Sequence, residues 1–115
     1  MAEPTLTPAL QQQLAQLQQQ NAQLQATAQQ RAQFEAMKAE GEQALQALET
    51  LAEDAPVYRS VGAFLVKEPG KAAAVARLRD DQETLEIRVA RLHKQEAALR
   101  ESLQALQAKL QGALK

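Results

Sequence analysis

The sequence contains no cysteine and no tryptophan, and aromatic residues make up only 3% of its 115 positions. The absence of cysteine excludes disulfide bonds, thiolate metal sites and a cysteine nucleophile. With so few aromatic rings, a compact core built on large side chains is not expected. The abundance of Ala, Leu, Gln, Glu and Arg instead predicts long helices or a coiled coil.

An excess of one charge and long apolar runs are also lacking. The formal net charge is -1, whereas a general binder of nucleic acid needs a basic face, so we expect no nucleic-acid partner. No apolar run reaches the roughly 18 residues that a membrane span requires. The opening residues, MAEPTLTPAL, lack the features of a secretory signal. We therefore expect a cytoplasmic protein with no membrane partner.

No group of residues indicates catalysis. His93 is the only histidine, and without cysteine or a second histidine it is not expected to bind a metal. Gly62 and Gly70 fall in predicted turns rather than in a phosphate-binding loop. The sequence supplies no base partner for Ser60 or Ser102. We expect no enzyme activity, no catalytic residue, no metal and no cofactor.

A first helix is predicted over residues 7–54. Thr7 is a favourable N-cap, Pro8 suits the first helical position, and Pro56 disfavours helical backbone just before it. The inward residues should follow a heptad, with steps of three and four: Leu10, Leu14, Leu17, Asn21, Leu24 and Ala28. Beyond these positions the apolar residues leave this phase, which predicts a local shift of the seam.

A second helix is predicted over residues 71–112. Its inward positions step by three and four, and leucine fills most of them: Val75, Leu78, Gln82, Leu85, Val89, Leu92, Glu96, Leu99, Leu103, Leu106 and Leu110. The connection between the helices is too short to run back along either of them, so we expect an antiparallel two-helix coiled coil. That arrangement places Arg31 of the first helix opposite Glu96 of the second.

The segment between the helices, residues 55–70, has the composition of a β-hairpin. Its sequence, APVYRSVGAFLVKEPG, is rich in β-branched and aromatic residues, with a central glycine and a proline towards each end. A two-residue turn at Gly62-Ala63 allows a type II′ geometry because glycine comes first. One face would carry Val57, Arg59, Val61, Phe64 and Val66, and the other Tyr58, Ser60, Leu65 and Lys67.

A hairpin of two strands is only marginally stable in water, and this one has apolar residues on both faces. Because free strand edges pair with other strands, we expect hairpins from several subunits to complete a closed sheet. In the alternative arrangement, the hairpin folds back onto its own helix ends around Leu48, Leu51 and Val75. The residues assigned to the contact between subunits are Val57, Tyr58, Val61, Gly62, Phe64, Leu65 and Val66.

The hairpin segment and the helix that follows it resemble the beta-class subunits of the prefoldin family. The resemblance is most specific in APVYRSVGAFLVKEP followed by LRDDQETLEIRVARLHKQEAALRESL, and it covers nearly the whole chain. The segment is too short for the two hairpins of alpha-class subunits. The resemblance implies a single prefoldin-like domain over residues 1–115, whose hairpin joins an intersubunit β-barrel in a hexamer.

The resemblance also implies a function. It predicts an ATP-independent chaperone, a holdase, which captures unfolded client proteins at the ends of the coiled coil and passes them to a group II chaperonin. Its other partners would be alpha-class prefoldin subunits, or further copies of itself in a homo-oligomer. The alternative hypothesis is a structural or adaptor coiled coil whose oligomer binds one fixed protein partner.

Both chain ends are expected at one end of the coiled coil. The seam becomes partly exposed where the helices stop, and exposed apolar patches commonly mark binding sites. For each leucine there, the alternative is an ordinary seam position inside the coiled coil. The candidate client-binding residues are Leu6, Leu10, Leu14, Leu106, Leu110, Ala113 and Leu114.

Overall fold

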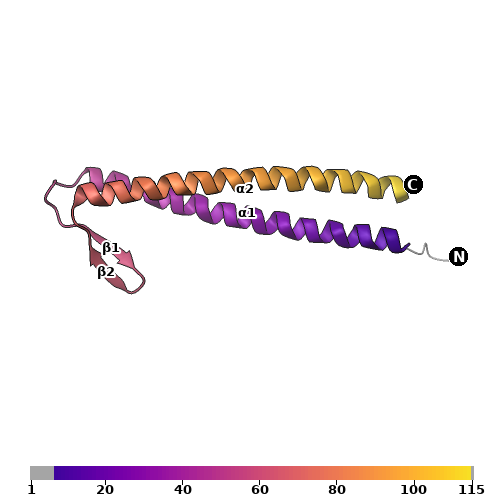
Figure 1. Ribbon diagram of the computed structural model, residues 1–115, viewed down its shortest axis with the longest axis horizontal. Coiled ribbons are helices and arrows are strands. Elements are labelled where there is room, and N and C mark those ends of the chain that lie inside the picture. The colour runs from indigo at the N-terminus through magenta and orange to yellow at the C-terminus, as the bar shows by residue number, and fades with distance from the viewer. Residues whose placement is uncertain (1–6, 115) are drawn as a thin grey trace. The chain divides into compact units, whose positions relative to one another are not determined.

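The computed structural model describes residues 7–114, which form two helices with a hairpin between them (Figure 1). The elements in chain order are α1 (Pro8–Glu49), β1 (Tyr58–Val61), β2 (Phe64–Lys67) and α2 (Lys71–Leu114). The mainly helical class and the central hairpin are therefore confirmed. The candidate residue Leu6 lies outside the described residues.

The described chain divides into two compact units, and each helix contributes to both. Unit 1 combines the residues up to Arg31 with those from Ala90 onward, and unit 2 is Ala32–Val89. Within each unit, a segment of α1 packs against a segment of α2 that runs in the opposite direction (Figure 1). The antiparallel pairing predicted from the short connection is thus present in both units.

The start of α1 has the predicted cap. The hydroxyl oxygen of Thr7 accepts a hydrogen bond from the backbone N–H of Leu10 at 3.1 Å. The carbonyl oxygen of Thr7 accepts the first helical bond, from the N–H of Gln11 at 2.9 Å. Pro8 occupies the first helical position, where its missing N–H costs no hydrogen bond. Thr7 therefore acts as the N-cap of α1.

The end of α1 comes at Glu49, ahead of the predicted end near Asp54. The N–H groups of Thr50 and Leu51 bond to carbonyls three residues earlier, at 3.3 and 3.1 Å, which tightens the last turn. The ammonium group of Lys71 then donates to the carbonyl of Leu51 at 2.8 Å. The same group lies 3.5 Å from the carbonyl oxygen of Glu49, so a side chain from the start of α2 also reaches a carbonyl that the end of α1 leaves without a helical partner.

The seam of α2 is the predicted one, because every residue assigned to it is buried or half-buried. Leucine dominates the buried set in both units. In unit 1 the buried leucines are Leu92, Leu103, Leu106 and Leu110, and in unit 2 they are Leu48 and Leu85. Full burial of one such side chain contributes on the order of 1.5–3 kcal/mol, so these residues account for much of the helix pairing.

The seam of α1 agrees with the prediction at five positions and differs at one. The residues that are half-buried as predicted are Leu10, Leu14, Leu17, Leu24 and Ala28. Asn21 was expected to face inward, but it is exposed, and Gln20 is half-buried in its place. The predicted shift of the seam is also wrong, because one pattern of alternating three- and four-residue steps runs through the whole helix. The buried and half-buried residues that follow it are Leu10, Gln13, Leu17, Gln20, Leu24, Thr27, Arg31, Phe34, Lys38, Gly41, Leu45 and Leu48.

Polar seam residues are paired across the two helices. In unit 1 the Arg31 guanidinium lies 2.8 Å from a carboxylate oxygen of Glu96, which confirms the predicted pairing. Ser102 also donates to the side-chain oxygen of Gln20 at 3.0 Å. In unit 2 the guanidinium of Arg88 lies over the ring of Phe34, 5.5 Å from its centre. Phe34 itself is half-buried in the seam of α1.

Candidate functional site

The hairpin has the predicted register. Tyr58 pairs with Lys67 and Val61 pairs with Phe64, which leaves Gly62-Ala63 as a two-residue turn. Gly62 has a φ of 59°, and no residue other than glycine has a positive φ in the described chain. This combination fits a type II′ turn, which needs a positive φ only at its first central residue, and excludes type I′, which needs it at both.

The pairing also fixes the two faces of the hairpin, because residues directly opposite one another lie on the same face. Arg59, Val61, Phe64 and Val66 share one face, and Tyr58, Ser60, Leu65 and Lys67 share the other. Both sets agree with the prediction for the residues of the two strands, whereas Val57, predicted on the first face, lies before β1. Each face therefore carries apolar side chains.

The side chains of the hairpin are exposed. All residues of both strands are exposed, and the exposed fraction reaches 76% for Phe64 and 74% for Leu65. Tyr58, Val61 and Val66 are also among the large exposed apolar residues. The alternative in which these side chains pack onto the helix ends around Leu48, Leu51 and Val75 is therefore not what the structure shows.

The edges of the hairpin are open within the chain. The sheet has only two strands in the described residues, so each strand has one neighbour and one free edge. Val57 lies just before β1, and its carbonyl accepts a hydrogen bond from the N–H of Glu68 at 2.8 Å, which extends the pairing beyond the strands. A free edge with exposed apolar side chains is a template for pairing with another strand.

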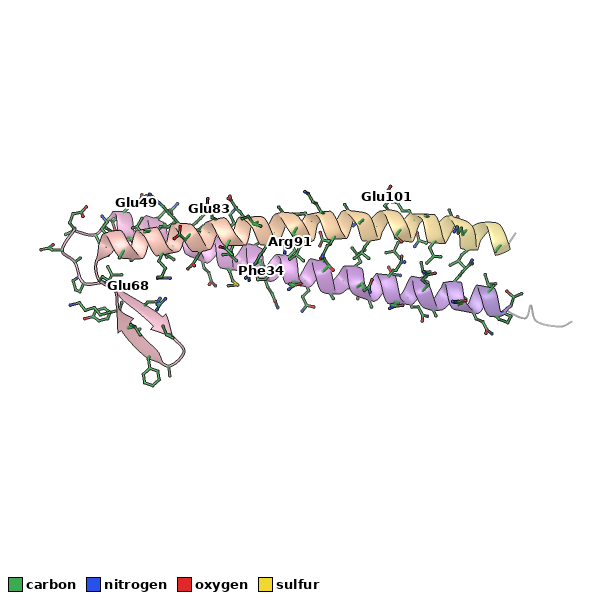
Figure 2. All side chains as sticks on the ribbon, in the orientation of Figure 1. Phe34, Glu49, Glu68, Glu83, Arg91 and Glu101 are labelled. Atoms are coloured by element: carbon green, nitrogen blue, oxygen red, sulfur yellow. The ribbon has the colours of Figure 1, made fainter. Side chains whose placement is uncertain are left out.

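The base of the hairpin carries a network of charges that the sequence did not reveal. Glu68, labelled in Figure 2, lies between β2 and α2. One of its carboxylate oxygens is 2.8 Å from Arg77 Nε. The same oxygen is 3.8 Å from Arg59 Nε on β1. Arg77 is also 3.3 Å from Asp81. No helix or strand period links Glu68 to Arg77, so no pattern in the sequence could have indicated this contact.

The candidate client-binding residues of unit 1 differ in exposure. Leu106 and Leu110 are buried, with exposed fractions of 8% and 5%. Leu10 and Leu14 are half-buried, and Ala113 is exposed. Leu114 ends α2, and its side chain lies outside the described set. A client could reach the buried leucines only if the ends of the two helices separated.

Charge is also buried in the core of unit 1. Glu96 is 1% exposed, and the Arg31 guanidinium that contacts it is 22% exposed. The ring of His93 is largely exposed, and its Nδ1 lies 3.8 Å from the same carboxylate. Across residues 7–114, no group of three or more His, Cys, Asp or Glu side chains is arranged to hold a metal ion. The contact of Arg31 with Glu96 joins α1 to α2 within unit 1.

Comparisons with known proteins agree with these features. A family model described as prefoldin subunit matches residues 11–115. The chain is 45% identical over 109 residues to the prefoldin subunit beta of Methanosarcina acetivorans, covering 95% of this chain and 92% of that protein. It is 46% identical over 109 residues to the prefoldin subunit beta of Archaeoglobus fulgidus, covering 95% and 93%.

Solved structures give the same result. The crystal structure of the prefoldin beta subunit from Thermococcus strain KS-1 covers 98% of both chains, with a TM-score of 0.84 and 39% sequence identity. The prefoldin beta2 subunit from the same strain shares the fold, with a TM-score of 0.71 at 21% identity. Neither described helix is both long and apolar enough to cross a membrane.

Proposed function

Since this chain belongs to the prefoldin family and is similar to its beta subunits over most of its length, we propose that it acts as an ATP-independent holdase. Prefoldin subunits are non-enzymatic chaperone components that assemble with one another. In the proposed role, the chain captures unfolded proteins in the cytoplasm and passes them to a group II chaperonin. It acts within a hexamer, either with alpha-class subunits or with copies of itself.

The exposed hairpin is the observation that carries the proposal. Phe64 and Leu65 are the most exposed large apolar residues among those that the structure describes, and they lie on opposite faces of a two-stranded sheet with two free edges. Such a sheet is marginal in isolation, and the burial of apolar side chains against neighbouring strands would stabilise it. We infer that hairpins from several subunits close into the β-barrel.

Client capture is assigned to the helix ends in unit 1. Leu10 and Leu14 are half-buried, whereas Leu106 and Leu110 are sealed in the seam. Helix termini open locally at a lower free energy than the rest of a domain, so fraying would expose these leucines transiently. Several such weak sites in one hexamer would hold an unfolded chain together through multivalency.

Two measurements on the same samples test the proposal. Native mass spectrometry of the chain, alone and with an alpha-class subunit, should show a hexamer in at least one sample. That hexamer should suppress the aggregation of two unrelated denatured proteins. Removal of residues 1–9 and 111–115 should lower this suppression and leave the hexamer intact.

The results of these two measurements distinguish the holdase function from the adaptor function. Suppression that does not change in the truncated hexamer would rule out capture at the helix ends. A dimer, or an oligomer that binds one protein and protects neither denatured client, would support the adaptor function instead.

A further inference from the structure

Glu68 connects the hairpin to α2 through its side chain. Its carboxylate contacts Arg77 of α2 at 2.8 Å and Arg59 of β1 at 3.8 Å, and Arg77 contacts Asp81 at 3.3 Å. We call these four residues the junction network. Positive and negative groups alternate along it, so each inner member faces opposite charges on both sides. The network runs from Asp81 on α2 to Arg59 on the first strand of the hairpin.

The position of Glu68 is fixed by its backbone as well as by its side chain. Its N–H donates to the carbonyl of Val57 at 2.8 Å, which holds it in register with the start of the hairpin. Pro69 follows, and a residue before proline is restricted to extended backbone conformations. Its side chain is 10% exposed, compared with 58% for Asp81 at the outer end of the network. Glu68 is thus the enclosed centre of the junction network.

The hairpin has little else to set its direction. Every side chain of both strands is exposed, so apolar packing against the helices does not orient them. A groove of about 670 Å³ is lined by Ser60 of β1 together with Arg77, Leu85 and other residues of the two helices. The hairpin therefore borders an open groove instead of lying on the helix surface.

We propose that Glu68 is a positioning residue for assembly. By bridging Arg77 and Arg59, it fixes the direction in which the hairpin leaves α2. That direction decides which edge and which apolar face a neighbouring subunit meets. A carboxylate that accepts from the Nε of an arginine forms a charge-assisted hydrogen bond, which is stronger and more directional than a neutral one. The consequence for assembly rests on the proposed function, whereas the direction of the hairpin does not.

A distance measurement within the chain tests the direction of the hairpin. Because the sequence has no cysteine, Ala63→Cys and Glu83→Cys place single spin labels at two exposed positions, one on the turn and one on α2. Labelled chains are diluted with unlabelled chains so that only distances within one chain are recorded. The unchanged chain should give one narrow distance peak, and Glu68→Gln should lose it.

The matched control is Glu86→Gln, which makes the same chemical change in the same unit. Glu86 lies 3.2 Å from Lys38 in an ion pair between α1 and α2 that does not touch the hairpin. The control should keep the narrow peak and should assemble as the unchanged chain does. Arg77→Lys keeps the positive charge but loses the planar donor group, so its peak should broaden without disappearing.

Native mass spectrometry on the same variants gives the second result. Glu68→Gln should lose most of its hexamer while its helix content by circular dichroism stays that of the control. A narrow peak retained in Glu68→Gln would overturn the proposal, and so would a lost peak with the hexamer unchanged. Should the unchanged chain form no hexamer, even with an alpha-class subunit, the proposed function fails, and the distance peak alone decides the role of Glu68.

Discussion

The side chain of Gln82 occupies the space that a Cβ atom at Gly41 would need. A Cβ added at Gly41 would clash with the side-chain amide oxygen of Gln82, and it would lie 2.9 Å from the side-chain amide carbon of the same residue. The side-chain amide nitrogen of Gln82 donates a hydrogen bond, at 2.8 Å, to the carbonyl oxygen of Lys38, which lies one helical turn before Gly41 on α1. The glycine inside α1 and the glutamine in the leucine-rich seam of α2 therefore form one packing unit.

This relationship predicts that the effect of Gly41→Ala depends on residue 82. Alanine gains roughly 1 kcal/mol of helix propensity over glycine. With Gln82 present, that gain is offset by displacement of a hydrogen bond worth about 1 kcal/mol. With Gln82 present, Gly41→Ala should therefore leave the free energy of unfolding nearly unchanged or lower. In the Gln82→Ala background, the same substitution should raise the free energy of unfolding by about 1 kcal/mol.

A double-mutant cycle from urea unfolding at one protein concentration measures this coupling. The concentration must be held fixed because assembly contributes to the apparent stability. Equal stabilisation by Gly41→Ala in both backgrounds would show that Gln82 does not compete for the space.

The ion pair of Arg31 and Glu96 leads to a second prediction. Glu96 is almost fully buried, and its second carboxylate oxygen has no hydrogen-bond partner among the residues that the structure describes. Arg31→Leu should lower the free energy of unfolding by about 3 kcal/mol, because it leaves a buried charge without its main partner. Adding Glu96→Leu should bring stability back to within about 1 kcal/mol of the unchanged chain. Thermal unfolding of the two variants measures the difference, and a double variant less stable than Arg31→Leu would contradict this account.

A third prediction concerns the turn of the hairpin. Gly62 has a positive φ and no atom within 4 Å of an added Cβ, so only backbone strain opposes a side chain there. Gly62→Ala should cost roughly 1–2 kcal/mol in the hairpin and reduce the fraction of assembled chain in native mass spectrometry. Gly112→Ala is the control, because it also meets open space but lies in α2 without a positive φ. The prediction is wrong if both variants assemble equally well.

The exposed apolar residues supply a fourth prediction. Phe64→Ser should abolish assembly without lowering the helix content, because a side chain that is 76% exposed in the single chain contributes its burial only between subunits. Ile87→Ser is the matched control, since Ile87 is 61% exposed on α2. Mass measurement and circular dichroism of both variants check the result. If both variants lost the oligomer equally, the contact between subunits would involve the helices as well as the hairpin.

Much of the fold could be predicted from local residue preferences and from the spacing of leucine in α2. The cap at Thr7 and the turn at Gly62 each depend on one residue type with a specific backbone preference. The α2 seam has leucine at most of its inward positions, so only one phase of the heptad repeat places these leucines against α1. The pairing of Arg31 with Glu96 then followed from antiparallel geometry alone.

The phase of α1 was harder to predict because glutamine surrounds its leucines. Leu17 and Leu24 fit two seams, one of which places Gln20 inward and the other Asn21. Leu14 and Ala28 favour the seam through Asn21, whereas Phe34 and Leu48 favour the seam through Gln20, so the pattern of hydrophobic residues gives no single answer. In the structure Gln20 is half-buried, and its side-chain oxygen accepts a hydrogen bond from Ser102 of α2. The junction network could not be predicted either. Its central contact joins Glu68, before α2, to Arg77 on α2, and no helical or strand repeat relates these two positions.

The mixed seam of α1 also bears on errors of folding. A two-helix pair with leucine at every inward position could slide by one heptad at little cost, and chains could exchange helices with their neighbours. Here, a slip by one heptad would set Arg31 against Leu103 and leave a charge buried among leucines. The polar residues in the seam of α1 thus give the helices a single favourable alignment, and misaligned or helix-exchanged forms are penalised before a subunit meets its partners.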